Sequence, residues 1–398
     1  MAAAPYITIW RFIRRLIMLL SLLVLIAILI FEIGAFFRIS ILYLPSWAFT
    51  SLTSYFVLLV VICCGAYFLV RGRRSGSRST AVAITVAAVT AINLFGAALI
   101  ERNLVATGQK LEIPISLLES FKSPTSDTHA RISHVSYTMF ESAPLNLTIY
   151  RSDATSGRSQ PALIYVHGGG WISGSADARQ ADLKWFAQQG WVVFAVDYAL
   201  STTERHLWDV TGGQIACSMA WVGAHAAQFG ADPSRLYMIG ESAGGNLVLN
   251  ASYMANANSL RSPCGGSVPH VRAVVADYPV IDAVNVYNNP DSMQGPSARA
   301  MLIKYTGGSP ERYPGRYESI SSERYLTAAA PPTMIIVGEK DSLVPPQPTY
   351  DFAGRARSDG VQVELVRVPY MDHAFDVFPH SLGNQLFRRG AAKFLRQH

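Results

Sequence analysis

The first hundred residues contain three long stretches without a charged side chain, and this feature constrains the architecture most. Residues 16–31 are uncharged, and after Glu32 the apolar run continues to Phe37, while residues 47–70 and 80–100 are uncharged throughout. Each stretch approaches or exceeds the ~20 residues with which a helix crosses a bilayer. Buried helices of a soluble domain are the alternative, but apolar runs this long are typical of membranes. We predict a membrane region over 1–104, with spans at about 16–37, 47–70 and 80–100.

The basic residues that flank these stretches predict how the chain crosses the membrane. Arg11, Arg14 and Arg15 precede the first stretch, whereas only Arg38 lies between the first and the second. The link between the second and third stretches carries Arg71, Arg73, Arg74 and Arg78. Because cytoplasmic loops are enriched in Lys and Arg, we expect the N-terminus and this second link to be cytoplasmic. Three crossings then put the rest of the chain on the extracytoplasmic side, whether periplasmic, lumenal or extracellular.

The cysteines are compatible with this orientation. Cys63 and Cys64 lie in the second apolar stretch, where we interpret them as small apolar fillers. Cys217 and Cys264 lie in the large C-terminal part, where an oxidising compartment would permit a disulfide between them. Two free buried thiols are the alternative, because the sequence does not reveal the distance between the two Cα atoms.

After the membrane region, residues 105–129 are weakly patterned, and we predict a linker with a short helix near 115–121. From residue 130 to 398, short apolar runs alternate with segments of helical spacing. The expected strands are 134–140, 145–150, 162–166, 191–196, 236–239, 271–276, 333–337 and 363–368, and the expected helices are 177–189, 213–229, 246–255 and 386–395. Such alternation is typical of an α/β domain with a mainly parallel sheet covered on both faces.

One segment, 282–332, interrupts this alternation and is rich in tyrosine and methionine. A long insertion between sheet strands is often a lid or a substrate-binding segment. We favour a cap, and a surface excursion that packs its own aromatic side chains is the alternative.

A short motif lies between an expected strand and an expected helix: Gly240-Glu241-Ser242-Ala243-Gly244. A serine flanked by glycines at such a sharp turn is held clear of the backbone as a nucleophile. An ordinary glycine-rich turn is the alternative, since a chain of this length contains Gly-x-Ser-x-Gly by chance about one time in ten. The interpretation therefore depends on partner residues elsewhere in the chain.

A nucleophilic serine needs a histidine base and a carboxylate that orients it, in the chain order Ser, acid, His. Of the later histidines, His373 directly follows the last expected strand, and His380 is the weaker candidate; the others are His270 and His398. Asp341 follows the strand 333–337 and is the expected acid, with Glu339, Asp277 and Asp282 as rivals. A helix N-cap is the alternative role for Asp341.

A fourth component precedes the nucleophile: His167-Gly168-Gly169-Gly170-Trp171, after the strand 162–166. Glycines let backbone N–H groups turn towards a ligand oxygen. Two such donors, together with the N–H of Ala243, would stabilise the negative oxygen of a tetrahedral intermediate. We expect His167 to orient this loop.

With these motifs in place, residues 130 to the C-terminus resemble α/β-hydrolases of the hormone-sensitive-lipase-like carboxylesterase group. The matching segments are 167–171, Val196-Asp197-Tyr198, 240–246 and Asp372-His373-Ala374-Phe375. The resemblance implies Ser242 as nucleophile, His373 as base, Asp341 as acid, and Gly169, Gly170 and Ala243 as oxyanion donors, with Gly168 as a further candidate. Two features depart from the group: Ala199 stands where an arginine is common, and the acid segment 338–345 is more similar to feruloyl-esterase, formamidase and peptidase relatives.

We therefore predict a membrane-anchored serine hydrolase that cleaves a small-molecule or lipid carboxylic ester, without a metal or an organic cofactor. An amide or formamide hydrolase or a peptidase with the same triad is the nearest alternative, and a catalytically idle membrane scaffold is a more distant one. A transporter is disfavoured because the three stretches contain almost no ionisable residue besides Glu32. The net charge of +6 partly reflects the arginines around the stretches, so we expect no nucleic-acid partner.

Overall fold

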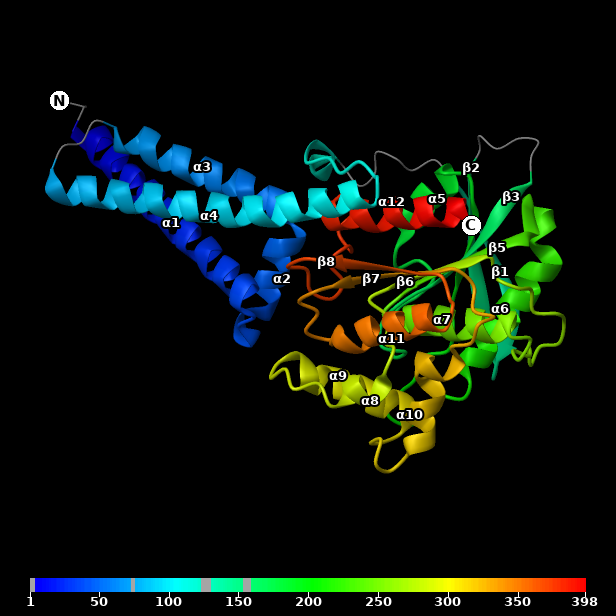
Figure 1. Cartoon of the computed structure of the whole chain (residues 1–398). Coiled ribbons are helices and arrows are strands. Elements are labelled where there is room, and N and C mark those ends of the chain that lie inside the picture. The colour runs from blue at the N-terminus through cyan, green and yellow to red at the C-terminus, as the bar shows by residue number, and fades with distance from the viewer. Residues whose placement is uncertain (1–3, 73–75, 123–129, 153–158) are drawn as a thin grey trace.

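The computed structural model describes residues 4–72, 76–122, 130–152 and 159–398. Arg73, Arg74 and the end of the expected linker lie outside the described residues. Within the described part, long N-terminal helices extend away from an α/β domain (Figure 1).

Three N-terminal helices cover the apolar stretches: α1 (Ala4–Phe37), α3 (Thr53–Arg71) and α4 (Ser77–Lys110). Among the described residues, Ile9–Phe37, Thr53–Arg71 and Ser77–Lys110 are long and apolar enough to cross a membrane. Arg14 donates hydrogen bonds to the carbonyls of Val70 and Arg71, so the start of α1 lies beside the end of α3. Figure 1 shows this end of the helical bundle far from the α/β domain.

The second apolar stretch is divided between two helices, α2 (Tyr43–Ser51) and α3, with a break at Leu52. Thr50 and Thr53 donate side-chain hydrogen bonds to backbone carbonyls of the preceding turn, a pattern that bends or interrupts helices. As a result α2 leaves the bundle and lies beside the α/β domain (Figure 1). The expected span over 47–70 therefore includes residues that the structure places in α2.

The expected linker also differs from the structure. α4 continues to Lys110, so the first residues after 104 are helical. Near the expected short helix of 115–121, the structure has a 3₁₀ turn, η2 (Leu118–Phe121). Lys393 on the last helix donates to the carbonyl of Leu111, which ties the end of α4 to the α/β domain.

In the described part of the chain, eight strands form one sheet in the order β1-β2-β4-β3-β5-β6-β7-β8. β2 pairs antiparallel with β1 and with β4, and the remaining pairs are parallel, which confirms the expected mainly parallel sheet. The strands are β1 (Ala130–Phe140), β2 (Ala143–Ser152), β3 (Gln160–Val166), β4 (Val192–Val196), β5 (Ala231–Glu241), β6 (Ala273–Asp277), β7 (Thr333–Gly338) and β8 (Val363–Val368).

Helices cover both faces of this sheet, because the central strands are apolar on both sides and buried throughout. They are α5 (Gln180–Gln188), α6 (Thr211–His225) with η3 (Ala226–Phe229), α7 (Ala243–Asn256), α11 (Gln347–Ser358) and α12 (Leu382–Gln397). α11 was not expected from the sequence. The segment 282–332 contains α8 (Ala283–Tyr287), α9 (Gln294–Thr306), α10 (Pro314–Ile320) and η4 (Ser322–Tyr325).

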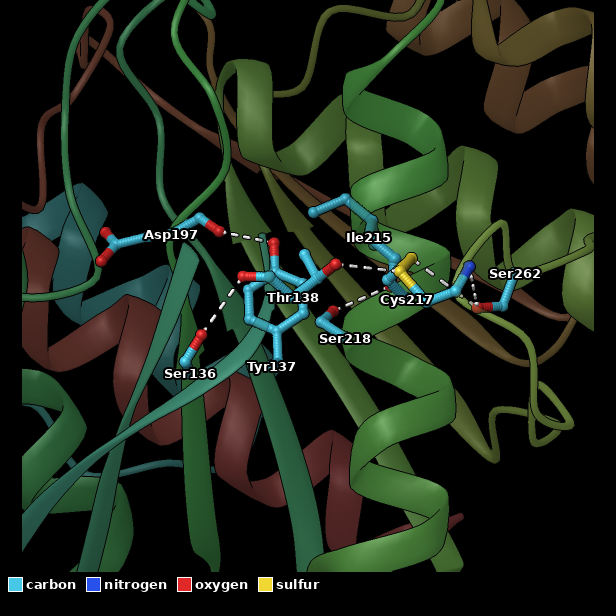
Figure 2. The surroundings of a disulfide bond; sticks show 9 residues. Ser136, Tyr137, Thr138, Asp197, Ile215, Cys217, Ser218 and Ser262 are labelled. Atoms are coloured by element: carbon cyan, nitrogen blue, oxygen red, sulfur yellow. Dashed lines mark hydrogen bonds between the residues drawn. A yellow bond between two sulfur atoms is a disulfide. The ribbon is translucent and has the colours of Figure 1, made fainter. Parts of the chain in front are cut away.

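A disulfide joins Cys217 on α6 to Cys264 in the loop before β6, with 5.4 Å between the two Cα atoms. Figure 2 shows Cys217 with Ser262 and Thr138 around the bond. Thr138 on β1 has its hydroxyl 3.1 Å from the Cys264 sulfur. The bond therefore fastens the loop before β6 to α6, close to the β1 edge of the sheet.

Candidate active site

The turn between β5 and α7 holds Ser242 in a conformation that few residues adopt. Its φ of 53° and ψ of −118° lie outside the ordinary helical and extended regions. Its N–H donates to the carbonyl of Asp277 at 2.8 Å, which fixes the turn to the neighbouring strand. A Cβ at Gly244 would lie 2.1 Å from the Val166 carbonyl oxygen, so only glycine fits there. The motif therefore forms the tight turn between a strand and a helix that was expected from the sequence.

The structure brings Ser242, His373 and Asp341 together. His373 Nε2 lies 3.0 Å from Ser242 Oγ, and His373 Nδ1 lies 2.8 Å from Asp341 Oδ2. Asp341 is fully buried, and its other oxygen accepts the N–H groups of Leu343 and Val344. These contacts form a continuous chain of hydrogen bonds from the acid to the serine hydroxyl.

The surroundings of His373 stabilise its protonated form more than water stabilises that of a free imidazole. Burial opposes the charge, but the charge of Asp341 and its hydrogen bond outweigh burial and raise the pKa of His373. The charge of Asp372 also raises the pKa of His373. The Asp372 carboxylate accepts hydrogen bonds from the N–H groups of Ser342 and His373. Burial, followed by the charge of Asp341, raises the pKa of Asp372 to about 6.

The glycine loop that follows β3 runs alongside the nucleophile. A Cβ at Gly168 would lie 3.3 Å from the Cβ of Ser242, and both Gly169 and Gly170 have positive φ. Among the described residues, the N–H groups of Gly169 and Gly170 have no hydrogen-bond acceptor. His167 stacks on Tyr198, with 4.3 Å between ring centroids, and its Nδ1 lies 2.7 Å from the Gly168 carbonyl oxygen. These contacts fit a residue that orients the loop.

The 282–332 segment contacts this glycine loop through α9. A Cβ at Gly170 would lie 2.5 Å from Met301 Sδ, so α9 passes directly over the glycines. Trp171 stacks in parallel on Tyr305 of α9, with 4.4 Å between ring centroids. The segment also packs its own rings, since Tyr287 meets Tyr317 edge to face. Its role as a cap stays a prediction.

The other candidates lie away from the chain of hydrogen bonds. Glu339 pairs with Arg367 at the surface, and Asp282 caps α8 by accepting two backbone N–H groups. His380 Nδ1 accepts a hydrogen bond from Arg388. Among the described residues, no group of three or more His, Cys, Asp or Glu is placed to hold a metal ion.

A buried arginine links the two loops that carry the serine and the histidine. Arg179, just before α5, forms ion pairs with Glu241 at 2.7 Å, with Asp376 at 2.5 Å and with Asp182 at 2.7 Å. Glu241 immediately precedes Ser242. All four side chains are nearly or fully buried. Glu241 is part of the Gly-x-Ser-x-Gly motif, but nothing in the sequence around Arg179 identifies it as the partner of Glu241.

Tyr278 connects this charge cluster to the base. Its hydroxyl donates to Asp376 at 2.7 Å and lies 3.1 Å from Glu241, while its ring meets His373 edge to face at 4.6 Å. Asp277, fully buried next to it in the chain, carries a further acidic group. Burial, followed by the charge of Asp376, raises the pKa of Asp277 well above its ordinary value. Burial and the neighbouring charge therefore both disfavour the ionised form of Asp277.

A nucleophile turn in the middle of a mainly parallel sheet, with an acid and a histidine on later loops, defines the α/β-hydrolase fold. The chain belongs to the BD-FAE family, whose model matches residues 147–355. It is 29% identical over 232 residues to the esterase LipQ of Mycobacterium tuberculosis, covering 57% of this chain and 53% of LipQ. The chain thus spans about half the length of the curated relatives it matches.

Solved structures show the same fold. A bacterial heroin esterase is 25% identical, with a TM-score of 0.57 over 74% of this chain and 90% of its own. A thermophilic esterase from Thermogutta terrifontis, 24% identical, has a TM-score of 0.55 over 70% of this chain and 97% of its own. These matches confirm the α/β-hydrolase resemblance predicted from the motifs.

Proposed function

We propose that this chain is a membrane-anchored serine hydrolase that cleaves carboxylic esters through an acyl-enzyme. The observation that carries the proposal is the chain of contacts from Asp341 through His373 to Ser242. The esterase names of its relatives support the substrate class.

The geometry supports the following sequence of steps. Ser242 Oγ attacks the ester carbonyl carbon while His373 Nε2 takes the hydroxyl proton, and Asp341 stabilises the resulting imidazolium. The N–H groups of Gly169, Gly170 and Ala243 stabilise the negative oxygen of the tetrahedral intermediate. The C–O bond then breaks, and His373 returns the proton to the leaving alcohol. Water, deprotonated by the same histidine, releases the acid and restores Ser242.

Two measurements on the full-length protein in detergent test this proposal. A fluorophosphonate probe should label Ser242, and p-nitrophenyl esters should be hydrolysed. Ser242→Ala should abolish labelling and lower kcat by about 10⁴–10⁶-fold. Ser259→Ala, which replaces an exposed serine three residues after α7, should leave both unchanged. Folded protein that neither labels nor hydrolyses any ester would leave only the idle-scaffold alternative.

Amide hydrolysis is the second candidate, because the triad itself serves both reactions and the acid segment 338–345 is more similar to formamidase and peptidase relatives. Matched ester and amide substrates with the same acyl group distinguish the two. We expect the ester to have the higher kcat/KM, and a higher value for the amide would reassign the activity. A series of p-nitrophenyl esters of increasing chain length would then define the acyl group.

We further propose that the N-terminus is cytoplasmic and the α/β domain extracytoplasmic. Arginines at the start of α1 and the end of α3 support this orientation, as does the disulfide, since disulfides persist in oxidising compartments. In intact cells, a membrane-impermeant maleimide should label Ser358→Cys on α11. It should not label Ser77→Cys at the start of α4. The reverse pattern would invert the topology.

A further inference from the structure

Two residues outside the α/β domain donate hydrogen bonds to the loops that carry His373 and Asp341. The indole Nε1–H of Trp47, on α2, donates to the main-chain oxygen of His373 at 2.9 Å. Arg38, which follows α1, donates from Nη2 to the main-chain oxygen of Asp341 at 3.3 Å. The membrane region therefore contacts the main chain of both the base and the acid of the proposed triad.

Further contacts surround these two hydrogen bonds. The ring of Trp47 packs on Phe378 with 5.3 Å between centroids, and Phe36 packs on Tyr370 at 5.0 Å. Lys340, on the acid loop, donates from Nζ to the carbonyl of Phe36 at 3.3 Å. The loop that carries His373 thus has one polar and two aromatic contacts with α1 and α2. The loop that carries Asp341 has two polar contacts, with Arg38 and with Phe36.

The corner between α1 and α2 is itself held in place. Ser46 on α2 donates to the carbonyl of Phe31 on α1 at 3.0 Å. Ser40 donates to the carboxylate of Asp291, in the segment before α9, at 3.1 Å. The corner is therefore fixed relative to the first membrane helix on one side and to the 282–332 segment on the other.

A small cleft of about 30 Å³ lies between this corner and the loops that carry His373 and Asp341. Arg38, Tyr43 and Trp47 line it on the membrane side, and Lys340, Tyr370 and Asp372 line it on the other. Trp47 and Arg38, which donate the two hydrogen bonds, and Tyr370, which packs on Phe36, all line this cleft.

His373 has to keep Nδ1 on Asp341 and Nε2 on Ser242 at the same time, and a displacement of about 1 Å can lower the rate of an enzyme ~100-fold. We propose that Trp47 is a positioning residue for His373 and that Arg38 has the same role for Asp341. The membrane region then supports the active site as well as anchoring it. This inference rests on the proposed function, because it concerns the rate of that reaction.

The test compares the full-length chain with Trp47→Phe in the same detergent. Phenylalanine keeps a ring against Phe378 but has no N–H for the His373 carbonyl. We expect kcat for p-nitrophenyl acetate to fall about 10-fold with KM unchanged, because Trp47 positions the base and is not assigned to substrate binding. We also expect the acid limb of the kcat/KM profile to move to lower pH, because a looser contact with Asp341 stabilises the imidazolium less.

Trp10→Phe is the matched control, since Trp10 lies near the opposite end of α1 and should leave all these values unchanged. Rates are normalised to the sites titrated by the fluorophosphonate probe, which removes any effect of misfolded protein. Normalised kcat within twofold of the parent, or a pH profile that does not move, would overturn the inference while leaving the proposed function intact. A parent protein that neither labels nor hydrolyses esters would instead overturn the proposed function.

Discussion

The proposed triad is supported from two sides, and the two supports differ in chemistry. On the inner side, Arg179 forms buried ion pairs with the carboxylates near Ser242 and His373. On the membrane side, Trp47 and Arg38 donate to main-chain carbonyls beside a cleft. A buried charge that loses its partner costs about 3–5 kcal/mol, whereas a neutral main-chain carbonyl that loses one hydrogen bond costs about 1–3 kcal/mol. The inner support should therefore affect mainly the stability of the fold, and the outer one mainly the rate.

The largest effect is expected for Arg179→Met, which removes the inner support. Glu241, Asp376 and Asp182 would remain buried without their shared counter-ion. We expect the free energy of unfolding to fall by about 3–5 kcal/mol, the range for breaking one side of a buried ion pair. Thermal unfolding of the full-length protein in detergent measures this change.

Arg235→Met is the control for that prediction, because Arg235 also pairs with an aspartate three residues away, Asp232. That pair is much more exposed: 39% of the Arg235 side chain and 31% of the Asp232 side chain are accessible to solvent. Its loss should change the free energy of unfolding by less than about 1 kcal/mol. Equal effects of the two substitutions would show that the Arg179 cluster is not a stabilising unit.

The next effect in size concerns the disulfide between Cys217 on α6 and Cys264 in the loop before β6. Replacing Cys217 and Cys264 together by serine opens a link between residues 47 positions apart. We expect a loss of about 2–4 kcal/mol of stability. The kcat/KM for p-nitrophenyl acetate should remain within twofold of the parent at 25 °C. A tenfold fall in kcat/KM of the folded variant would mean that a third region also positions the triad.

A smaller effect is expected for Asp372→Asn, at the edge of the cleft. The amide keeps an oxygen for the N–H groups of Ser342 and His373 but removes a negative charge. That charge helps to raise the pKa of His373, so its removal lowers this pKa. Because the reaction needs the neutral imidazole, the acid limb of kcat/KM should move to lower pH, by less than about one unit.

The same substitution has a second consequence, for stability. Since the folded protein raises the pKa of Asp372 to about 6, this group contributes most to stability below about pH 4, and that contribution is lost as the pH rises through 6. The parent should therefore lose thermal stability relative to Asp372→Asn over this interval. For the kinetic prediction above, an acid limb of kcat/KM that moves to higher pH in Asp372→Asn would show that Asp372 does not raise the pKa of His373.

The two supports also differ in how far the sequence reveals them. Ser242, His373 and Asp341 follow apolar strands, so local pattern and chain order suffice to nominate them. Trp47 and His373 are 326 positions apart, and nothing local to either residue signals the contact. Arg179 is hidden for the same reason.

The N-terminal helices show a second limit of sequence patterns. The stretch 47–70 is uncharged throughout and mostly apolar, so hydropathy alone predicts one helix. The break at Leu52 depends on where the Thr50 and Thr53 hydroxyls bond, which hydropathy does not record. The position of α2 beside the catalytic loops follows from that break.

The smallest effect is expected for Asp277→Asn. This substitution tests whether the buried Asp277 carboxyl, next to the Arg179 cluster, contributes a charge to the inner support. Burial and the charge of Asp376 raise the pKa of Asp277, and the amide is nearly isosteric with a neutral carboxyl group. At acid pH, where the carboxyl is neutral in both the folded and the unfolded chain, we expect less than about 1 kcal/mol of change. The raised pKa means that this group stabilises the fold most at acid pH and progressively less as the pH rises towards its folded pKa.

Thermal unfolding at pH 5 and pH 8 should therefore show that the stability of the variant relative to the parent increases at the higher pH. A variant that is destabilised by several kcal/mol at both pH values would mean that Asp277 is ionised and paired, and that the inner support depends on one more charge than the Arg179 contacts indicate.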